Sequence, residues 1–315
     1  MPIMTFALTA QGRDLDMSPE AWGRLRPSTD IVDDATALRA RMKVEGYLYL
    51  PGLLNRAEVL EARRTVTERL LAAGHLDPAS PPMQAIAPPD REVSFQPDAR
   101  KDRNVPEVAK DNAELFKVLY TGPMIEFFTR FLGGPVRHYD FTWFRAVAPG
   151  AGSLPHCDVP YMGRGTHNLY TAWTPIGDVD FEQGGLIVLE GSPKHVGRLR
   201  AYLNRDVDTY CVNGPHAQAI ETGKRKWGAF DGVLGKDPVE LREKFGGRWL
   251  STEFSAGDVL IFSVYTIHAS LDNHSRHVRL SSDTRYQLAL EPVDDRWVGE
   301  NPAGHGVAGK RGRIC

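Results

Sequence analysis

Two histidines and one aspartate have the types and the spacing to bind a metal ion. His156 and Asp158 lie two residues apart, so in an extended segment they point to the same face, while Cys157 between them points away. His268, from a distant segment, can supply the third ligand. Two histidines and one carboxylate cover one face of an octahedral ion and leave the other positions open, as in non-haem Fe(II) oxygenases. We therefore predict an open, catalytic metal centre at His156, Asp158 and His268.

Other histidines compete for this role, and a His-x-Asp pair alone also describes a polar strand end. His195 follows a loop and is predicted to be structural, whereas His274 and His277 lie in or beside a turn and are predicted to be solvated. His138 and His167 remain candidates by residue type alone. The residues around the triad therefore decide the interpretation.

An arginine beyond His268 can bind a carboxylate near the metal. Arg279 follows a turn, and we expect it on the strand next to the one that carries His268. A guanidinium fork suits bidentate binding of a carboxylate. Ser281 on the same strand face, and Ser270 two residues past His268, could each donate a hydroxyl hydrogen bond to that group. Arg285 is the alternative, about 20 Å further along the strand, where it could instead meet a substrate carboxylate or a buried acid.

Composition excludes several classes of protein. The 315 residues are 42% hydrophobic and 25% charged, with a formal net charge of −2, which gives no case for a nucleic acid or an anionic membrane as partner. No apolar run approaches the roughly 20 residues that span a bilayer, and Met1 to Gln11 lacks the features of a secretory signal. Cys157, Cys211 and Cys315 are odd in number and far apart, which predicts reduced thiols in a cytoplasmic protein. The oligomeric state is not readable.

Capping signals predict helices in the first part of the chain. Asp33 or Asp34 can cap a helix that Gly46 ends, and Asn55 can cap the next one. A third helical pattern, residues 112–132, is interrupted at Gly122-Pro123. The proline-rich segment 77–106 lacks helical periodicity and is either a linker or a flap over a site.

From residue 136 onward, short alternating runs separated by turn residues predict a β-sandwich or barrel, with a jelly roll as the natural candidate. One such run, residues 259–269, carries His268 near its end. We predict a single domain over residues 1–315, with a helical part at about 30–132, a jelly-roll core at about 135–292 and an insertion at 199–249. The insertion either shapes the substrate pocket at the barrel mouth or is a surface excursion. The basic tail, residues 304–313, is predicted to be mobile.

The assembled motifs resemble a known family. His156-x-Asp158, His268 with Ser270, and Arg279-x-Ser281 resemble the ligand motifs of the phytanoyl-CoA dioxygenase family of Fe(II)/2-oxoglutarate-dependent oxygenases. The runs 171–175 and 184–195 resemble the core strands of that family, and the Gly46-Tyr47 strand with its following helix resembles the N-terminal part. The likeness covers about residues 35 to 290.

The resemblance implies both fold and chemistry. The expected fold is mainly β with flanking helices (α+β), a double-stranded β-helix of the cupin-like jelly-roll type. The implied cofactors are Fe(II), bound by His156, Asp158 and His268, and 2-oxoglutarate, whose distal carboxylate Arg279 and Ser270 hold beside Trp173. With O2 as co-reactant, the implied enzyme hydroxylates a small organic substrate and releases succinate and carbon dioxide. The carboxylate of Asp158 favours oxidation over halogenation, because halogenating relatives carry a small residue there.

Two other functions fit the residues. A metal-dependent hydrolase or isomerase could use the same open triad with Zn²⁺, and a non-catalytic jelly-roll binding protein could retain it without activity. The substrate itself is not readable from the sequence. Lys224, Arg225 and Lys226 could meet phosphates or form a solvated surface, so they do not identify a coenzyme A site.

Overall fold

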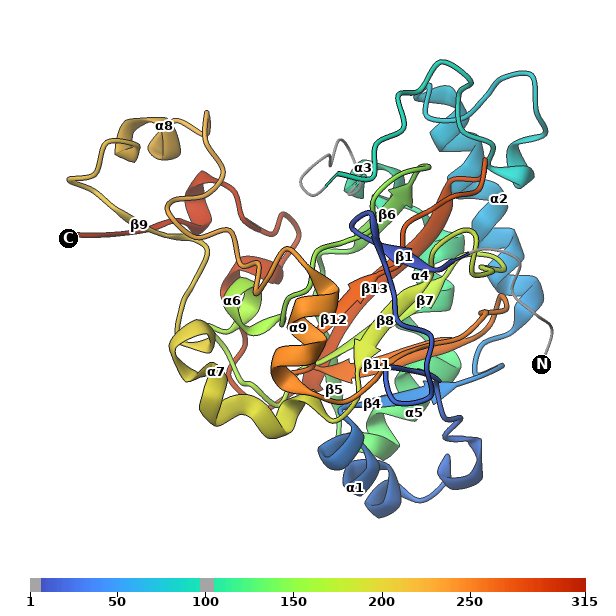
Figure 1. Ribbon diagram of the computed structural model, residues 1–315, viewed down its shortest axis with the longest axis horizontal. Helices are drawn as coiled ribbons and strands as arrows, with labels where there is room; N and C mark the ends of the chain where they lie inside the picture. Colours follow the sequence, from blue (N-terminus) through green and yellow to red (C-terminus); the bar gives the residue numbers. More distant parts are fainter. Residues whose placement is uncertain (1–6, 97–104) are drawn as a thin grey trace.

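A computed structural model describes residues 7–96 and 105–315 and shows a six-stranded antiparallel sheet at its centre. The strand order is β4-β11-β7-β13-β5, and β6 also pairs with β13. The long strand β13, Arg279–Leu288, runs through the middle of Figure 1. The other strands of the sheet are β4 (Tyr47–Leu50), β5 (Val136–His138), β6 (Trp143–Val147), β7 (Tyr170–Pro175) and β11 (Val259–Ser263).

A second, four-stranded sheet packs against the first. Its order is β12-β8-β10-β3, with bounds His268–Ser270, Leu186–Leu189, Trp249–Ser251 and Trp22–Arg24. One apolar cluster joins Trp173 and Leu260 of the large sheet to Val188 and Leu250 of the small one, so the two sheets share a core. This arrangement confirms the predicted jelly roll. Strand β4 of the predicted helical part joins the large sheet, and β3, which precedes that part, joins the small one. The domain boundaries stay a prediction.

Helices cover the outer face of the large sheet, which leaves its inner face for the site (Figure 1). Asp34 caps the first of them by accepting hydrogen bonds from the N–H groups of Thr36 and Ala37, and Gly46 ends it with φ +85°. Asn55 caps the second, and the pattern over 112–132 is interrupted as predicted. The covering helices are α1 (Ala35–Glu45), α2 (Arg56–Ala72), α4 (Ala113–Tyr120) and α5 (Gly122–Leu132), with the short α3 (Pro106–Ala109) beside α2.

The segment that carries His268 is two strands, where the sequence predicted one. The chain turns after Ser263, where the Thr266 N–H donates to the Ser263 carbonyl and the Thr266 hydroxyl donates to the Gly46 carbonyl. It thereby crosses from the large sheet to the small one before β12 begins. Arg279 starts β13 in the large sheet, so the expectation that it lies on the strand next to His268 was wrong. The two residues belong to different sheets.

The insertion and the C-terminal tail form one unit on the side of the barrel away from α2 (Figure 1). Strand β9 (Thr209–Cys211) of the insertion pairs in parallel with β14 (Arg311–Arg313) of the tail, so the tail is ordered and the prediction that it is mobile was wrong. Helix α7 (Val196–Leu203) leads into the insertion, which also contains α8 (Ala217–Glu221) and α9 (Pro238–Phe245), and α6 (Val159–Met162) contacts α7.

A disulfide joins this unit. Cys211 of β9 and Cys315 are bonded, with their Cα atoms 5.5 Å apart. The prediction of three reduced thiols was therefore wrong for this pair and holds for Cys157, which is free and buried. Spacing along the sequence could not reveal the pairing, because 104 residues separate the two cysteines.

Within the part of the chain that the structure describes, no helix has the length and apolar character needed to cross a bilayer. The proline-rich segment contains one short 3-10 helix, Pro82–Gln84. Residues 97–104 of the predicted linker or flap lie outside the described residues.

We expect Asp272→Ala to destabilise the fold, because the Asp272 carboxylate is buried and accepts four hydrogen bonds. They come from the N–H groups of Gln11, Gly12 and Gly152 and from the Thr9 hydroxyl, at 2.7 to 2.9 Å. Removing it leaves buried donors without a partner, which lowers the free energy of unfolding by about 3 kcal/mol. Urea denaturation measures this loss. The control is Asp14→Ala at an exposed position of β2 (Arg13–Asp14), and equal effects of both changes would contradict the assignment.

We expect reduction of the Cys211–Cys315 disulfide to lower the free energy of unfolding by about 2–4 kcal/mol, because the crosslink restricts the unfolded chain. Thermal unfolding with and without dithiothreitol measures the difference. Cys315→Ser serves as the internal control, because its melting temperature should not respond to the reductant. A wild-type protein that is equally stable in both buffers would show that the crosslink does not form.

Candidate active site

The structure brings the three predicted ligands together. One ligand atom from each of His156, Asp158 and His268 lies within 4.8 Å of the others. The Nε2 atoms of the two histidines are 3.9 and 3.8 Å from the same carboxylate oxygen, Oδ1 of Asp158. Two imidazole nitrogens and one carboxylate oxygen are a donor set that suits Fe(II) and leaves coordination positions open.

A backbone bridge sets the two histidines side by side. The N–H of His156 donates to the carbonyl of His268 and the reverse bond also forms, both at 3.0 Å. Asp158 is not extended, as the sequence argument assumed, because its ψ of −21° begins the helical turn α6. The three side chains nevertheless converge, and Cys157 points away, with its Sγ 3.4 Å from the Tyr265 carbonyl.

A hydrogen bond at Nδ1 of each histidine fixes which ring nitrogen carries the proton. His156 Nδ1 lies 2.7 Å from the Leu154 carbonyl, and His268 Nδ1 lies 3.0 Å from the Thr266 carbonyl. A carbonyl oxygen only accepts, so each Nδ1 carries the proton and each Nε2 has a lone pair for a metal. Burial lowers the pKa of His268, which favours the neutral ring that binds a metal.

The other oxygen of Asp158 is held by two side chains. Its Oδ2 accepts from the Thr171 hydroxyl at 2.5 Å and from Arg285 Nη2 at 3.2 Å, which leaves Oδ1 toward the histidines. Burial opposes the ionised form, but the positive charge of Arg285, the two imidazoles and the Thr171 hydrogen bond hold the pKa of Asp158 well below its usual range. Asp158 is therefore an anion before any metal binds.

Arg285 meets a buried acid, which was one of the alternatives that the sequence offered, but the acid is the predicted metal ligand Asp158, and the contact of Thr171 with the same carboxylate was not predicted. Arg285 and Thr171 face one another across the β13–β7 ladder, and the Arg285 guanidinium also lies 4.1 Å above the Trp143 ring. The sequence indicated that Arg285 shares a strand face with Arg279. It did not indicate that the acid bound by Arg285 is the metal ligand Asp158.

Arg279 occupies a buried position with unused hydrogen-bonding capacity. Its side chain is 2% exposed, and one Nη donates to the Gly184 carbonyl. Its Nε, the Ser281 hydroxyl on the same strand face and the Trp173 indole N–H have no hydrogen-bond partner among the described residues. Burial, reinforced by the nearby charge of Arg145, lowers the pKa of Arg279 to about 10, so it remains a cation at neutral pH. A buried cation with an unpartnered Nε, on the strand face that carries the unpartnered Ser281 hydroxyl, fits the carboxylate of 2-oxoglutarate.

The Ser270 hydroxyl is engaged elsewhere. It accepts from the Ser153 N–H at 2.7 Å and lies 3.0 Å from the Ser153 hydroxyl, so the unpartnered hydroxyl beside Arg279 is that of Ser281. The competing histidines contact other groups: His138 the Tyr139 carbonyl, His167 the Tyr265 hydroxyl, His274 the Thr9 hydroxyl and His277 the Gln84 carbonyl. His195 packs against Phe245. None of the five belongs to the metal-binding group found among the described residues.

Comparison with known proteins identifies the family. The family model for phytanoyl-CoA dioxygenase (PhyH) matches residues 42–281, more than half of the chain. The chain belongs to the phytanoyl-CoA dioxygenase family. Together with the triad, this makes the protein a non-haem iron, 2-oxoglutarate-dependent oxygenase.

Relatives whose names state an activity are consistent with this membership. A 1-deoxypentalenic acid 11-beta-hydroxylase of Streptomyces exfoliatus is 29% identical over 275 residues, which are 83% of this chain and 84% of that protein. The alpha-ketoglutarate-dependent carbocyclase SnoK from nogalamycin biosynthesis superposes with a TM-score of 0.57 at 19% identity, over 85% of this chain and 90% of that one. The epimerase SnoN, solved with Fe3+ and alpha-ketoglutarate, gives 0.51 at 19% identity, over 82% and 85%. The two structures show the shared fold.

The dioxygenase triad opens into a pocket of about 700 Å³. His156, Asp158 and Arg285 lie in its lining, together with Phe141, Trp143 and Arg145. The insertion and the tail supply the remaining side, hereafter the roof, with pocket-lining residues Ile220, Gly223, Arg225, Lys226, Trp227, Asp231, Val233, Ala303, Gly304, His305, Gly306, Val307 and Lys310. Of the two roles predicted for the insertion, the structure shows the one that shapes the pocket.

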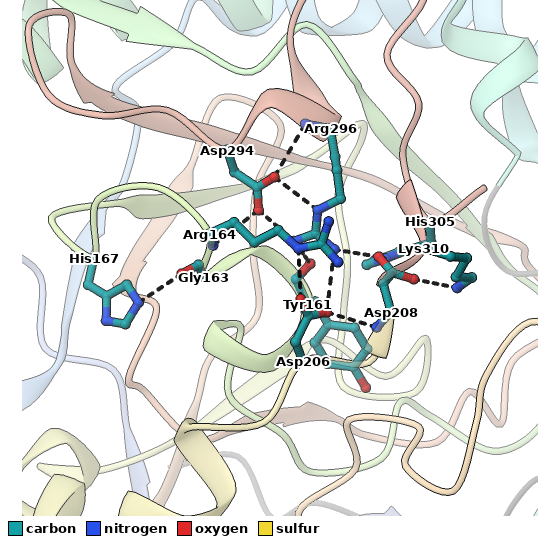
Figure 2. A network of polar contacts seen from close by, with 10 residues as sticks. All are labelled: Tyr161, Gly163, Arg164, His167, Asp206, Asp208, Asp294, Arg296, His305 and Lys310. Carbon is teal, nitrogen blue, oxygen red and sulfur yellow. Dashed lines mark hydrogen bonds and ion pairs between the residues drawn. The ribbon is translucent and has the colours of Figure 1, made fainter. Parts of the chain in front are cut away.

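A buried ion cluster fastens the roof to the segment that follows Asp158. Figure 2 shows Asp208 of the insertion bound by Arg296, His305 and Lys310. Arg296 also donates to the Tyr161 carbonyl of α6 at 2.9 Å. Two cations and an imidazole around one carboxylate compensate the cost of burying it.

We expect Arg285→Met to weaken metal binding about 10- to 100-fold, because the change removes the cation that orients and ionises Asp158. Titration of the apoprotein with Co(II), followed by its visible absorption, measures the affinity. The matched control is Arg276→Met at an exposed turn position, which should bind as the wild type does. Unchanged metal affinity in the Arg285 variant would show that the Arg285–Asp158 contact does not contribute to metal binding.

Proposed function

We propose that this oxygenase hydroxylates a small organic substrate, with His156, Asp158 and His268 binding Fe(II). Arg279 and Ser281 would hold the distal carboxylate of 2-oxoglutarate, with Trp173 beside them. The observation that carries the proposal is the pairing of an open triad with the buried Arg279, whose Nε and neighbouring donors lack an acceptor among the described residues. A hydrolase needs the triad but not this second anion site.

The chain's own residues position the reactants. The two Nε2 atoms and Asp158 Oδ1 would hold the metal, and His156 and Asp158 also line the pocket in which substrate would bind. When bound, iron supplies the activation of O2, in a reaction that converts 2-oxoglutarate to succinate and carbon dioxide and adds oxygen to substrate. The aromatic side chains that line the pocket would exclude water from the reacting carbon. The carboxylate at Asp158 fills the ligand position that halogenation would leave to chloride.

Hydroxylation is supported by the relative from Streptomyces exfoliatus, whose name is that of a hydroxylase. The partners we propose are a small organic substrate and O2. The absence of a nucleic-acid partner stays a prediction. A cytoplasmic location also stays a prediction, and the Cys211–Cys315 bond weighs against it because cytosolic disulfides are rare.

We expect the anaerobic protein with Fe(II) and 2-oxoglutarate to develop a visible metal-to-ligand charge-transfer band. Arg279→Met should require about 100-fold more 2-oxoglutarate to reach half of the full band, because it loses a charge-assisted bidentate contact. Arg276→Met again serves as the control. Under oxygen, the wild type should release succinate, and mass spectrometry of the substrate should show one added oxygen atom.

Asp158→Ala should lose both the band and succinate formation, because it removes the anionic ligand of the triad. Full activity in this variant would reject the triad. A zinc-dependent activity without succinate would instead support a hydrolase.

A further inference from the structure

The substrate pocket has a continuous aromatic wall. The ring centroid of Trp143 lies 4.7 Å from that of Phe141 and 4.6 Å from that of Trp297. Trp227 of the roof continues the wall, 4.8 Å from the His305 ring. Such surfaces bind an apolar body, and about 700 Å³ is within the usual range for small-molecule sites.

Most charged groups in the lining are already compensated by the protein. Arg285 is paired with Asp158, Arg145 with Asp283, and Lys310 with Asp208. Each pair combines one positive and one negative charge, so it has no net charge with which to attract a charged substrate.

Two cations of the roof differ from these pairs. Lys226 has no carboxylate within ion-pair distance among the described residues, and its side chain is exposed to the pocket. Arg225 also lines the pocket, and its Nε donates to the Trp227 carbonyl at 2.9 Å. The Lys226 amine lies 4.8 Å from the Trp227 ring centroid, and the Lys310 amine lies 4.6 Å from the same ring. Positive charge without a carboxylate partner is therefore concentrated on the roof, in a lining that combines aromatic side chains with ion-paired groups and the carboxylate of Asp231.

The surroundings of Lys226 disfavour its charge in the absence of an anion. Desolvation by the surrounding protein lowers the pKa of Lys226. The positive charges of Lys310 and Arg145 lower this pKa further, whereas the negative charge of Asp208 raises it. An anion that binds here relieves this repulsion and gains a charge-assisted hydrogen bond.

We propose that the substrate is an apolar carboxylic acid, and that Lys226, assisted by Arg225, binds its carboxylate while the hydrocarbon body lies along Phe141, Trp143 and Trp297. This proposal rests on the oxygenase function given above and names the substrate class of the same pocket. A carboxylate has two oxygens, so one could accept from the Lys226 ammonium and the other from the Arg225 guanidinium. The carboxylate-binding pair, Lys226 and Arg225, lies on the roof, whereas the metal ligands lie on the barrel. The carbon to be oxidised is therefore remote from the acid group.

Binding of matched probe molecules tests whether Lys226 and Arg225 bind a carboxylate, and it does not require the natural substrate. The probes are 1-adamantanecarboxylate and dodecanoate, the methyl ester of each, and dodecyl phosphate. Quenching of tryptophan fluorescence reports occupancy, because Trp143, Trp227 and Trp297 line the pocket. We expect the wild-type protein, loaded with Fe(II) and 2-oxoglutarate under anaerobic conditions, to bind at least one acid about 10- to 100-fold more tightly than its ester.

Lys226→Gln should abolish this preference, and Lys226→Arg should retain most of it. Lys224→Gln is the matched control, because Lys224 is an exposed lysine two residues away that does not line the pocket. Equal binding of acid and ester by the wild type would overturn the proposal, and so would an acid preference that survives Lys226→Gln. Tighter binding of dodecyl phosphate than of dodecanoate would overturn the assignment to a carboxylate. A wild-type protein without the charge-transfer band would contradict the oxygenase function itself, which separates the two failures.

Discussion

The two hydrogen bonds between His156 and His268 are the constraint on which the site depends. They join the segment that precedes α6 to the first residue of β12 in the small sheet. Two imidazoles from distant positions in the chain are thereby held with ring centroids 4.2 Å apart. The two sheets of the jelly roll hold this contact in place. The helices pack against the outer face of the large sheet and bury it from solvent. Loss of either sheet would separate the ligands.

Asp158 shows how the barrel prepares a metal position through protein contacts alone. One carboxylate oxygen is bound by Thr171 and Arg285 from adjacent strands, and the other faces the histidines. A buried carboxylate would ordinarily be costly, but here a cation and a hydroxyl stabilise its ionised form. The same strand, β13, presents Arg279 and Ser281 on the face that carries Arg285. One strand therefore serves both the metal ligand and the position proposed for the cosubstrate.

Local signals in the sequence were sufficient for much of this structure. Asp34, Asn55 and Gly46 marked helix ends because their caps involve neighbouring residues only. The triad could be predicted because His156, Asp158 and His268 are accompanied by Arg279-x-Ser281, and the full set of motifs is more specific than any one of them. The turn at Asp158 and the crossing between β11 and β12 could not, because both depend on hydrogen bonds to distant groups such as the Gly46 carbonyl. For the same reason, the Cys211–Cys315 bond and the ordered tail were missed, since each is fixed by contacts between segments far apart in the chain.

The roof has a consequence for how such an enzyme can diversify. The metal ligands and Arg279 come from the barrel, whereas one whole side of the pocket comes from the insertion and the tail. Asp208 and its three partners fasten these two segments together as one body. Mutations at the roof surface can alter which molecule enters while the oxidising apparatus stays intact. The insertion and the tail thus supply a side of the pocket that contains none of the metal ligands, so its side chains can change without the loss of a metal ligand.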